Sequence, residues 1–285
     1  MNYQHAFHAG NFADVHKHLV LTLVVMHLRK KDTAFRLIDT HAGAGRYDLL
    51  GAEALRSGEW RDGIGRLWDA ARSGAVTEPV RELIAPYLDA VAALNPDGDL
   101  RFYPGSPLLA AVLLRPQDRL IACELEPRAA AGLRAALGGD RRAKVLALDG
   151  WIALAANVPP KERRGLVLID PPFEDAGDFL RLSADLAKAY RKWPTGIYLL
   201  WYPIKERNAP DALAQRLGKL AIPKILRSEL LLGPPRPDAG LVGSGLFVVN
   251  PPFTLAADLR RVGPELAKAL APLAHHRLDG GVPAR

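Results

Sequence analysis

Short apolar runs alternate with helix-compatible stretches along most of the chain, and each run ends at a polar or glycine-rich turn. Strands of a parallel sheet have this continuous apolar pattern because helices cover both faces. The pattern therefore predicts an α/β fold with a doubly wound sheet, which binds ligands at the carboxyl ends of its strands. The expected parallel strands are Phe35–Ile38, Leu120–Cys123, Val145–Leu148, Leu166–Ile169 and Ile197–Leu200.

Two further apolar runs complete the predicted sheet. Lys224–Leu231 and Leu246–Val249 are joined by a loop too short for a crossover helix, so we expect them to pair antiparallel. The sheet would then have seven strands, mostly parallel, with an antiparallel last hairpin. The chain from His275 onward receives no assignment.

A long helix and an insertion accompany these strands. Apolar residues at helical spacing predict a helix over Ala13–Lys31, with Asn11 as its cap. About 80 residues separate the first two strands, whereas a βαβ unit needs only about 30. Because Arg56–Leu94 has helical patterning, we expect an inserted helical subdomain at residues 47–105 within a Rossmann-like domain of residues 1–46 and 106–285. The insertion is either a cap that grips the substrate or a passive structural insert.

Composition narrows the classes of protein and partner. The 285 residues, 49% of them hydrophobic, suffice for a full core, and the single cysteine, Cys123, excludes an internal disulfide and a cysteine zinc cluster. The amino terminus lacks a signal-peptide pattern and no apolar run approaches the length of a membrane span, so we expect a cytoplasmic protein without a membrane partner. The net charge of +7 and the pI of about 9.6 favour a polyanionic partner, although many proteins of this charge bind none.

Several strand ends carry residues suited to a nucleotide-like ligand. The turn Asp39–Gly45 contains Gly43 and lets the backbone approach such a ligand, but position 48 lacks the glycine of a dinucleotide fingerprint. Glu124, after the second strand, can accept hydrogen bonds from ribose hydroxyls. Asp149 and Gly150, after the third strand, can meet the exocyclic amine of an adenine ring, although Asp149 also fits a helix cap.

The fourth strand leads directly into Asp170-Pro171-Pro172-Phe173. A base amino group is a poor nucleophile because its lone pair is delocalised, and acceptors aimed at its N–H groups favour the rehybridisation needed to attack a methyl sulfonium. The Asp170 carboxylate and the Pro171 carbonyl can be these acceptors, and Phe173 offers a stacking face for the base. The motif therefore predicts an S-adenosylmethionine-dependent methyltransferase that acts on a base amine.

Other motifs favour structural roles. Asn250-Pro251-Pro252-Phe253 has a similar pattern but follows the final strand, away from the crevice beside the first strand, so Asn250 is assigned a structural role. Ser106 precedes a proline and an apolar helix and is first of all a helix N-cap. His16 and His18 diverge on a helix without a carboxylate or cysteine partner, so no metal is predicted.

Four segments together carry a family resemblance: Tyr3–His18, Asp39–Tyr47, Tyr103–Pro107 and Asp170–Phe173. With them the chain resembles the RlmJ family from Tyr3 to Pro252. Family members methylate N6 of one adenine in bacterial 23S ribosomal RNA. The resemblance therefore implies a Rossmann-like class I methyltransferase with S-adenosylmethionine as cofactor and 23S rRNA as partner, and we expect a monomer.

The resemblance also assigns site residues. It makes Asp170 the catalytic acceptor and places Tyr3 near the substrate adenine, with Phe173 stacking on the base. Phe173 departs from the family, which commonly has tyrosine there; stacking survives, but any role for a phenolic hydroxyl is lost. The expected cofactor contacts are His18, His41, Gly43, Ser106, Glu124, Asp149, Gly150 and Asp170.

Three other interpretations stay open. A DNA adenine-N6 methyltransferase would share the Asp-Pro-Pro-aromatic signature, because nothing in spacing or composition separates RNA from DNA as the substrate. A non-catalytic RNA-binding module would retain only a nucleotide pocket. A nicotinamide dehydrogenase would bind NAD in place of S-adenosylmethionine.

Overall fold

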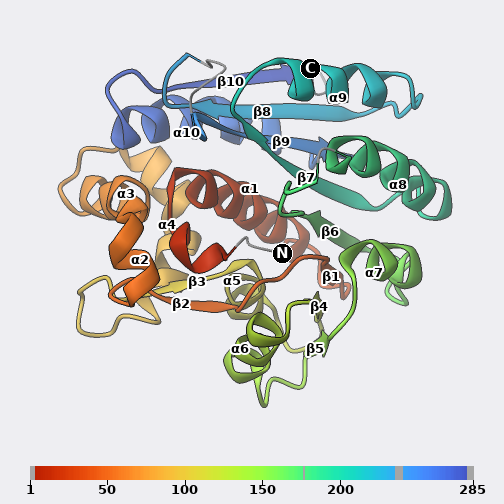
Figure 1. Ribbon diagram of the computed structural model, residues 1–285, viewed down its shortest axis with the longest axis horizontal. Helices are drawn as coiled ribbons and strands as arrows, with labels where there is room; N and C mark the ends of the chain where they lie inside the picture. The colour runs from red at the N-terminus through yellow and green to blue at the C-terminus, as the bar shows by residue number, and fades with distance from the viewer. Residues whose placement is uncertain (1–3, 176, 235–239, 281–285) are drawn as a thin grey trace.

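The computed structural model describes residues 4–175, 177–234 and 240–280 and is built around an eight-stranded sheet (Figure 1). The strand order is β10-β8-β9-β7-β6-β1-β4-β5. The strands are β1 (Arg36–Asp39), β4 (Arg119–Cys123), β5 (Ala143–Leu146), β6 (Gly165–Ile169), β7 (Ile197–Ile204), β8 (Ile225–Leu231), β9 (Gly243–Val249) and β10 (His275–Gly280). The first five are parallel, and β9 is antiparallel to both β7 and β8. The predicted α/β class, parallel strands and antiparallel hairpin are confirmed.

The chain changes its direction of travel across the sheet at β1. From β1 it proceeds outward to β4 and β5, and then returns to β6 and β7 on the other side. Asp39, the last residue of β1, is in register with Ala122 of β4 and with Leu168 of β6. The carboxyl ends of these three strands therefore meet at one edge, which is where a doubly wound sheet binds ligands.

The predicted count of seven strands is wrong, because β10 adds an eighth. This strand lies in the segment that received no assignment, and it pairs antiparallel with β8 from Leu226 to Leu231. Its sequence, His-His-Arg-Leu-Asp-Gly, has one aliphatic residue, since the strand forms the edge of the sheet and is only partly buried. An edge strand of this kind has no apolar pattern that could reveal it.

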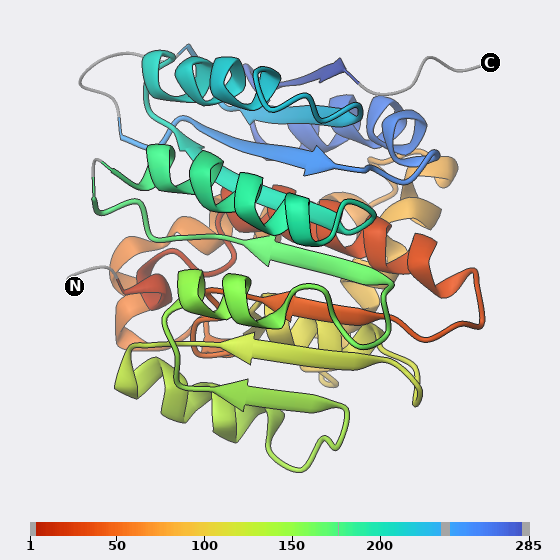
Figure 2. The ribbon, with the colours of Figure 1, turned by 90° about the vertical axis from the view of Figure 1, so that its right-hand side faces the viewer.

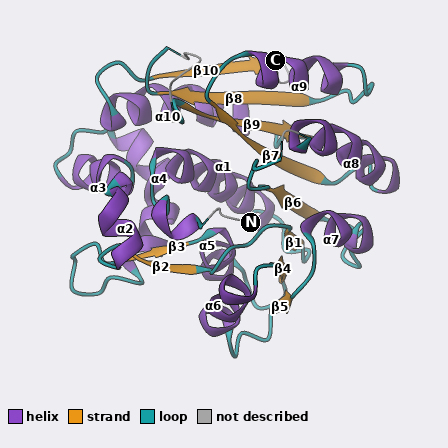
Figure 3. Ribbon diagram, viewed as in Figure 1, coloured by secondary structure: helices purple, strands orange, loops and turns teal. Residues whose placement is uncertain are grey.

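Helices cover both faces of the sheet (Figures 2 and 3). Residues of α1, α4, α5, α6 and α10 belong to the core on one face, and residues of α7, α8 and α9 to the core on the other. Within the described ranges, no helix is long and apolar enough to cross a membrane. The helices are η1 (His5–Phe7), α1 (Phe12–Arg29), α2 (Ala52–Ser57), η2 (Glu59–Asp62), α3 (Ile64–Arg72), α4 (Glu78–Ala92), α5 (Ser106–Leu113), α6 (Pro127–Leu137), α7 (Gly150–Asn157), α8 (Asp178–Lys192), α9 (Asn208–Gly218) and α10 (Leu255–Leu270).

Helix α1 lies at the centre of the first of these faces. Its predicted cap is confirmed, because the Asn11 side chain accepts hydrogen bonds from the backbone N–H groups of Ala13 and Asp14, both 3.0 Å. The helix is buried along nearly its whole length, since α4, α5 and α10 surround it and the sheet lies below. Charged side chains on α1 are consequently held inside the protein.

The inserted segment is helical, as the sequence predicted, and also contains a small sheet. Strands β2 (Arg46–Asp48) and β3 (Phe102–Pro104) pair antiparallel at its two ends, with Tyr47 opposite Tyr103. Figure 3 shows this ribbon apart from the main sheet, beside the helices of the insertion. Buried residues of α3 and α4 join the same core as α1, and the domain boundaries at 47 and 105 stay a prediction.

Candidate active site

The glycine turn and the acidic end of β4 contact each other directly. The Gly43 N–H donates to Glu124 Oε2 at 2.8 Å, and the other oxygen of Glu124 accepts from the Glu126 N–H, also at 2.8 Å. Gly43 has φ +63°, and a Cβ there would lie 2.3 Å from the Tyr47 hydroxyl, so only glycine fits the turn. The carboxylate of Glu124 is thereby fixed at the strand edge, and its remaining lone pairs suit ribose hydroxyls.

His41 and Gly150 form a second part of this edge. A Cβ on Gly150 would lie 2.5 Å from His41 Nε2, so the missing side chain lets β1 and α7 approach. The His41 ring packs edge-on against Trp151, with centroids 5.3 Å apart. Burial lowers the pKa of His41 to about 4, which keeps the ring neutral near pH 7.

Asp149 has the helix-capping role that its sequence position allowed. Its Oδ1 accepts hydrogen bonds from the N–H groups of Trp151 and Ile152, at 2.9 and 3.0 Å, and so caps α7. A capping carboxylate can still accept from a ligand through its other lone pairs. The cofactor role of Asp149 stays a prediction.

Asp170, which follows β6, is paired with a buried cation. Lys17 Nζ of α1 donates to Asp170 Oδ2 at 2.5 Å and also lies 2.8 Å from Asp14 Oδ1. Burial opposes the charge of Lys17, but the two carboxylates outweigh burial and hold its pKa well above the usual value. The carboxylate of the Asp-Pro-Pro-Phe motif is therefore one end of an Asp14–Lys17–Asp170 chain of charges.

The amino-terminal segment is tied to the same chain. His5 Nε2 lies 3.0 Å from Asp14 Oδ2, which also accepts from the Gly10 N–H at 2.9 Å. Burial opposes ionisation of Asp14, yet His5, Lys17 and His18 hold its pKa well below the usual value. The segment around η1 thus contacts the site, and Tyr3, its predicted substrate residue, lies outside the described residues.

His18 lies on α1 with Asp14 and Lys17 but makes a different contact. Its Nδ1 is 2.7 Å from the Tyr103 hydroxyl, and burial lowers the pKa of His18 to about 3. Its Nε2 lies 4.0 Å from Asp14 Oδ1. His18 therefore joins α1 to strand β3 of the insertion, and its cofactor contact stays a prediction.

Ser106 is not the N-cap that the sequence predicted. The cap of α5 is Gly105, and Ser106 is the first helical residue. Its hydroxyl donates to Asp39 Oδ2 at 2.6 Å, at the residue that begins the glycine turn. Burial raises the pKa of Asp39 to about 7, although the Ser106 hydrogen bond opposes the rise. The serine contacts the end of β1, where the predicted ligand edge begins.

An aromatic cluster borders Asp170. Phe173 has φ +52° and packs against Trp201 of β7, with centroids 5.7 Å apart, and against Phe179 at 4.8 Å. The Trp201 ring also lies 5.7 Å from Lys17 Nζ. Its indole N–H donates to Ser244 Oγ at 3.0 Å, which fixes the plane of the ring. Flat apolar faces therefore lie beside the acidic end of β6, and stacking of a base by Phe173 stays a prediction.

The contacts of Asn250, in the second proline motif, agree with the structural role predicted for this residue. Asn250 Nδ2 donates to the carbonyl groups of Pro194 and Gly196, both at 2.7 Å, and so fastens the loop before β7. Because β9 is antiparallel to β7, Asn250 lies at the opposite edge of the sheet from Asp170.

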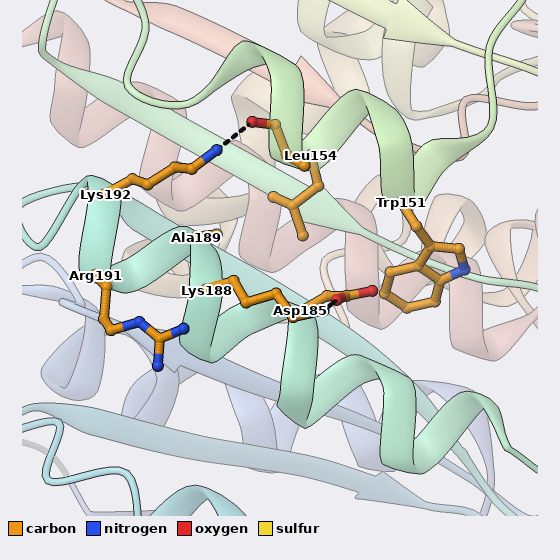
Figure 4. Close-up of a pocket in the computed structure, with 8 residues that line it drawn as sticks. Trp151, Leu154, Asp185, Lys188, Ala189, Arg191 and Lys192 are labelled. Atoms are coloured by element: carbon orange, nitrogen blue, oxygen red, sulfur yellow. Dashed lines mark hydrogen bonds and ion pairs between the residues drawn. The ribbon is translucent and has the colours of Figure 1, made fainter.

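A surface groove of about 350 Å³ lies apart from the strand-end contacts, between α7 and α8 (Figure 4). Lys192 Nζ donates to the Ala155 carbonyl across it at 2.9 Å. Trp151 lines the groove and also contacts His41, so the indole separates the groove from the strand ends.

Sequence reasoning assigned no site role to four residues that the structure places against the predicted site: Asp14, Lys17, Asp39 and Trp201. One signal was available for the first two, since charges three positions apart on an otherwise apolar helix are expected to pair when that helix is buried. Asp39 ends a buried strand, which is the same signal that identified Asp170. Trp201 follows the predicted end of its strand and had no comparable pattern.

The family follows from comparison with known proteins. A family described as "Ribosomal RNA large subunit methyltransferase D, RlmJ" matches residues 32–280. The chain belongs to the RlmJ family. Its likeness to RlmJ members thereby extends through all eight strands of the main sheet and both proline motifs.

Individual relatives agree with this assignment. The chain is 42% identical to Ribosomal RNA large subunit methyltransferase J of Escherichia coli over 272 residues, and 41% identical to that of Haemophilus influenzae over 273 residues. Each match covers 95% of both chains. A crystal structure of a Legionella pneumophila protein has a TM-score of 0.88 at 32% identity, and the match covers 97% of this chain and 99% of that one.

Membership in the RlmJ family makes this chain a methyltransferase, with S-adenosylmethionine as its methyl donor. The strand-end residues fit such a group. The glycine turn brings its backbone beside the fixed carboxylate of Glu124, and Gly150 lets the His41 ring lie against the start of α7 at the same edge. Because the His41 ring is neutral, it would not repel the positive charge of a sulfonium.

Proposed function

We propose that this chain transfers a methyl group from S-adenosylmethionine to N6 of an adenine in 23S ribosomal RNA. The observation that carries the proposal is the position of Asp170, at the end of β6 beside the glycine turn of β1, with Phe173 and Trp201 adjacent. Relatives named as large subunit ribosomal RNA methyltransferases support RNA as the substrate. We further propose a monomeric cytoplasmic enzyme that needs no metal ion, with residues 47–105 as an inserted subdomain.

The cofactor supplies an electrophilic methyl group on a sulfonium, and the protein prepares the nucleophile. Lys17 binds Asp170 Oδ2, so we assign Oδ1 and the Pro171 carbonyl as the acceptors for the two N–H groups of the adenine. Their pull raises electron density on N6 as the new bond forms. The proton that N6 loses goes to Asp170 or to solvent.

At the cofactor end of the site, we assign each residue a separate contact. Glu124 accepts from the ribose hydroxyls, while Asp149, Gly150 and His41 border the adenine of the cofactor. Ser106 and His18, which contact Asp39 and Tyr103 respectively, are further proposed cofactor contacts. Tyr3 and Phe173 border the substrate base.

Tritiated methyl transfer to protein-free 23S rRNA, followed by nucleoside mapping, tests the proposal. We expect label in N6-methyladenosine, no comparable label in duplex DNA, and loss of transfer in Asp170→Ala with cofactor binding largely kept. Preferential labelling of duplex DNA would favour a DNA methyltransferase. Calorimetry separates the remaining interpretations, because a binding module would not bind S-adenosylmethionine and a dehydrogenase would bind NAD.

A further inference from the structure

The outer face of the β2–β3 ribbon combines an aromatic ring with two arginine side chains. Phe102 of β3 is half-buried, and the guanidinium groups of Arg46 and Arg101 each lie 5.0 Å from its ring centroid. Arg46 and Arg101 are exposed. Asp48 lies 3.5 Å from Arg101 and balances only one of the two positive charges.

The inner face of the same ribbon is firmly held. Tyr47 and Tyr103 face inward and are buried, and their hydroxyl groups contact the Ala44 N–H at 3.0 Å and His18 at 2.7 Å. Because residues alternate between the faces of a strand, this anchoring fixes which side chains point outward. Arg46 and Phe102 are consequently presented to solvent by a rigid support.

A buried side chain of the insertion fixes Phe102 as well. Asn95, which follows α4, accepts hydrogen bonds from the N–H groups of Arg101 and Phe102, at 2.9 and 2.8 Å. Its amide also donates to the Phe102 carbonyl at 2.8 Å. The end of the helical insertion thus holds the backbone that carries the aromatic ring.

The β2–β3 ribbon begins at the end of the glycine turn. Arg46 directly follows Gly45, whose carbonyl accepts from the Gly105 N–H at 2.8 Å, so both strands are joined at the glycine turn. Figure 1 shows the ribbon running outward from this turn along the base of the insertion. Tyr47 of the ribbon lies 5.1 Å from His5 between ring centroids, and His5 contacts Asp14 of the chain of charges that ends at Asp170, so the ribbon is connected to the proposed base site.

We propose that the outer face of the β2–β3 ribbon binds the substrate RNA strand beside the target adenine, an inference that rests on the proposed function. Arg46 and Arg101 contact phosphates, and Phe102 stacks on an unpaired base, which is how proteins hold single-stranded RNA. The insertion is then the element that positions Phe102, through Asn95, for substrate binding.

Direct binding of in vitro transcribed 23S rRNA tests this surface. The double variant Arg46→Ala/Arg101→Ala should weaken RNA binding about tenfold and lower the slope of log affinity against log salt by about 1 to 2. Phe102→Leu, which keeps apolar volume, should weaken binding of unpaired RNA more than binding of an RNA duplex. The double variant should raise KM for RNA and leave kcat and S-adenosylmethionine affinity unchanged.

The matched control is Arg260→Ala/Arg261→Ala, which removes the same charge from exposed positions on α10. Equal RNA affinity in the two double variants would overturn the proposal. A parallel loss of cofactor affinity in Arg46→Ala/Arg101→Ala would also overturn it, because the effect would then lie in the glycine turn. Failure of the proposed function is a separate result, since it is absent methyl transfer by the unaltered chain, whereas RNA binding is measured without transfer.

Discussion

Lys17 and Asp170, 153 residues apart in the sequence, form a 2.5 Å ion pair that joins α1 to the end of β6. The pair occupies one oxygen of the carboxylate in the Asp-Pro-Pro-Phe motif and so holds its orientation. It also extends to Asp14 and from there to the amino-terminal segment through His5. The carboxylate is thus oriented before any substrate arrives, as electrostatic preorganisation requires.

Replacing Lys17 by Met should damage both stability and methyl transfer. The change leaves the buried Asp14 carboxylate and Asp170 without their shared cation, which we expect to cost about 3 to 5 kcal/mol of unfolding free energy. Urea unfolding measures the stability and single-turnover transfer measures the chemistry. Lys17→Arg keeps the charge and should recover most of the stability. Normal transfer by Lys17→Met would contradict the orienting role of the pair.

Gly150→Ala should prevent cofactor binding while Gly218→Ala, its control, should not. A Cβ at Gly150 would lie 2.3 Å from the Thr40 carbonyl oxygen and would push His41 out of place, whereas nothing lies within 4 Å of a Cβ at Gly218. Isothermal titration with S-adenosylmethionine measures the difference. Unchanged affinity in Gly150→Ala would remove this residue from the cofactor site.

Asp39→Asn should flatten the pH dependence of stability between about pH 4 and 7. The unfolded carboxyl releases its proton near pH 3.8, but the folded one holds the proton up to about pH 7 because it is buried. The folded state therefore binds more protons in this window, and the unfolding free energy falls as pH rises, by about 1.4 kcal/mol per pH unit. Asparagine has no such titration and can still accept from Ser106.

Urea unfolding across this pH range compares Asp39→Asn with the unaltered chain. Ser106→Ala serves as the second variant, because loss of its hydrogen bond should raise the pKa of Asp39 further and extend the slope to higher pH. Parallel curves for the unaltered chain and Asp39→Asn would show that Asp39 does not titrate in this window.

Gly263→Ala should destabilise the protein, although alanine is usually favoured over glycine within a helix. Gly263 lies inside α10, and a Cβ there would be 2.1 Å from Nδ1 of His276 on β10. We expect a loss of about 1 to 3 kcal/mol. Adding His276→Ala should recover part of it, and a double-mutant cycle of thermal unfolding measures the coupling. Additive effects would mean that the ring moves aside at no cost.

The fold was predictable because its central strands are buried on both faces, which leaves a continuous apolar run followed by a polar strand end. The positions of Asp170 and Glu124 at strand ends were predictable by the same reasoning, since each directly follows such a strand. The edge strand β10 was not predictable, because it is polar and gains its place by pairing with β8 and by the contact of His276 with Ser228.

Residues that act through distant contacts were harder to predict. Lys17 is found on a helix whose pattern indicates burial, and its partner Asp170 is 153 positions away, so no local spacing reveals the pair. Ser106 was predicted as a cap from local sequence, whereas its hydroxyl contacts Asp39 of β1. The orientation of Trp201 depends on its hydrogen bond to Ser244, which also lies 3.0 Å from His16 Nδ1. These contacts join β7, β9 and α1, which are far apart in the sequence.

Strand β10 has a consequence for how copies of the protein meet. Arg277 and Asp279 pair with each other at 2.7 Å on this outermost strand, and charges at such a position discourage another chain from adding to the sheet. The neighbouring strand β8 is largely buried. If the chain stopped before residue 275, β8 would become the edge of the sheet, and the backbone groups that pair with β10 would be exposed. Variants that end before residue 275 should therefore form aggregates at concentrations where the unaltered chain remains dispersed.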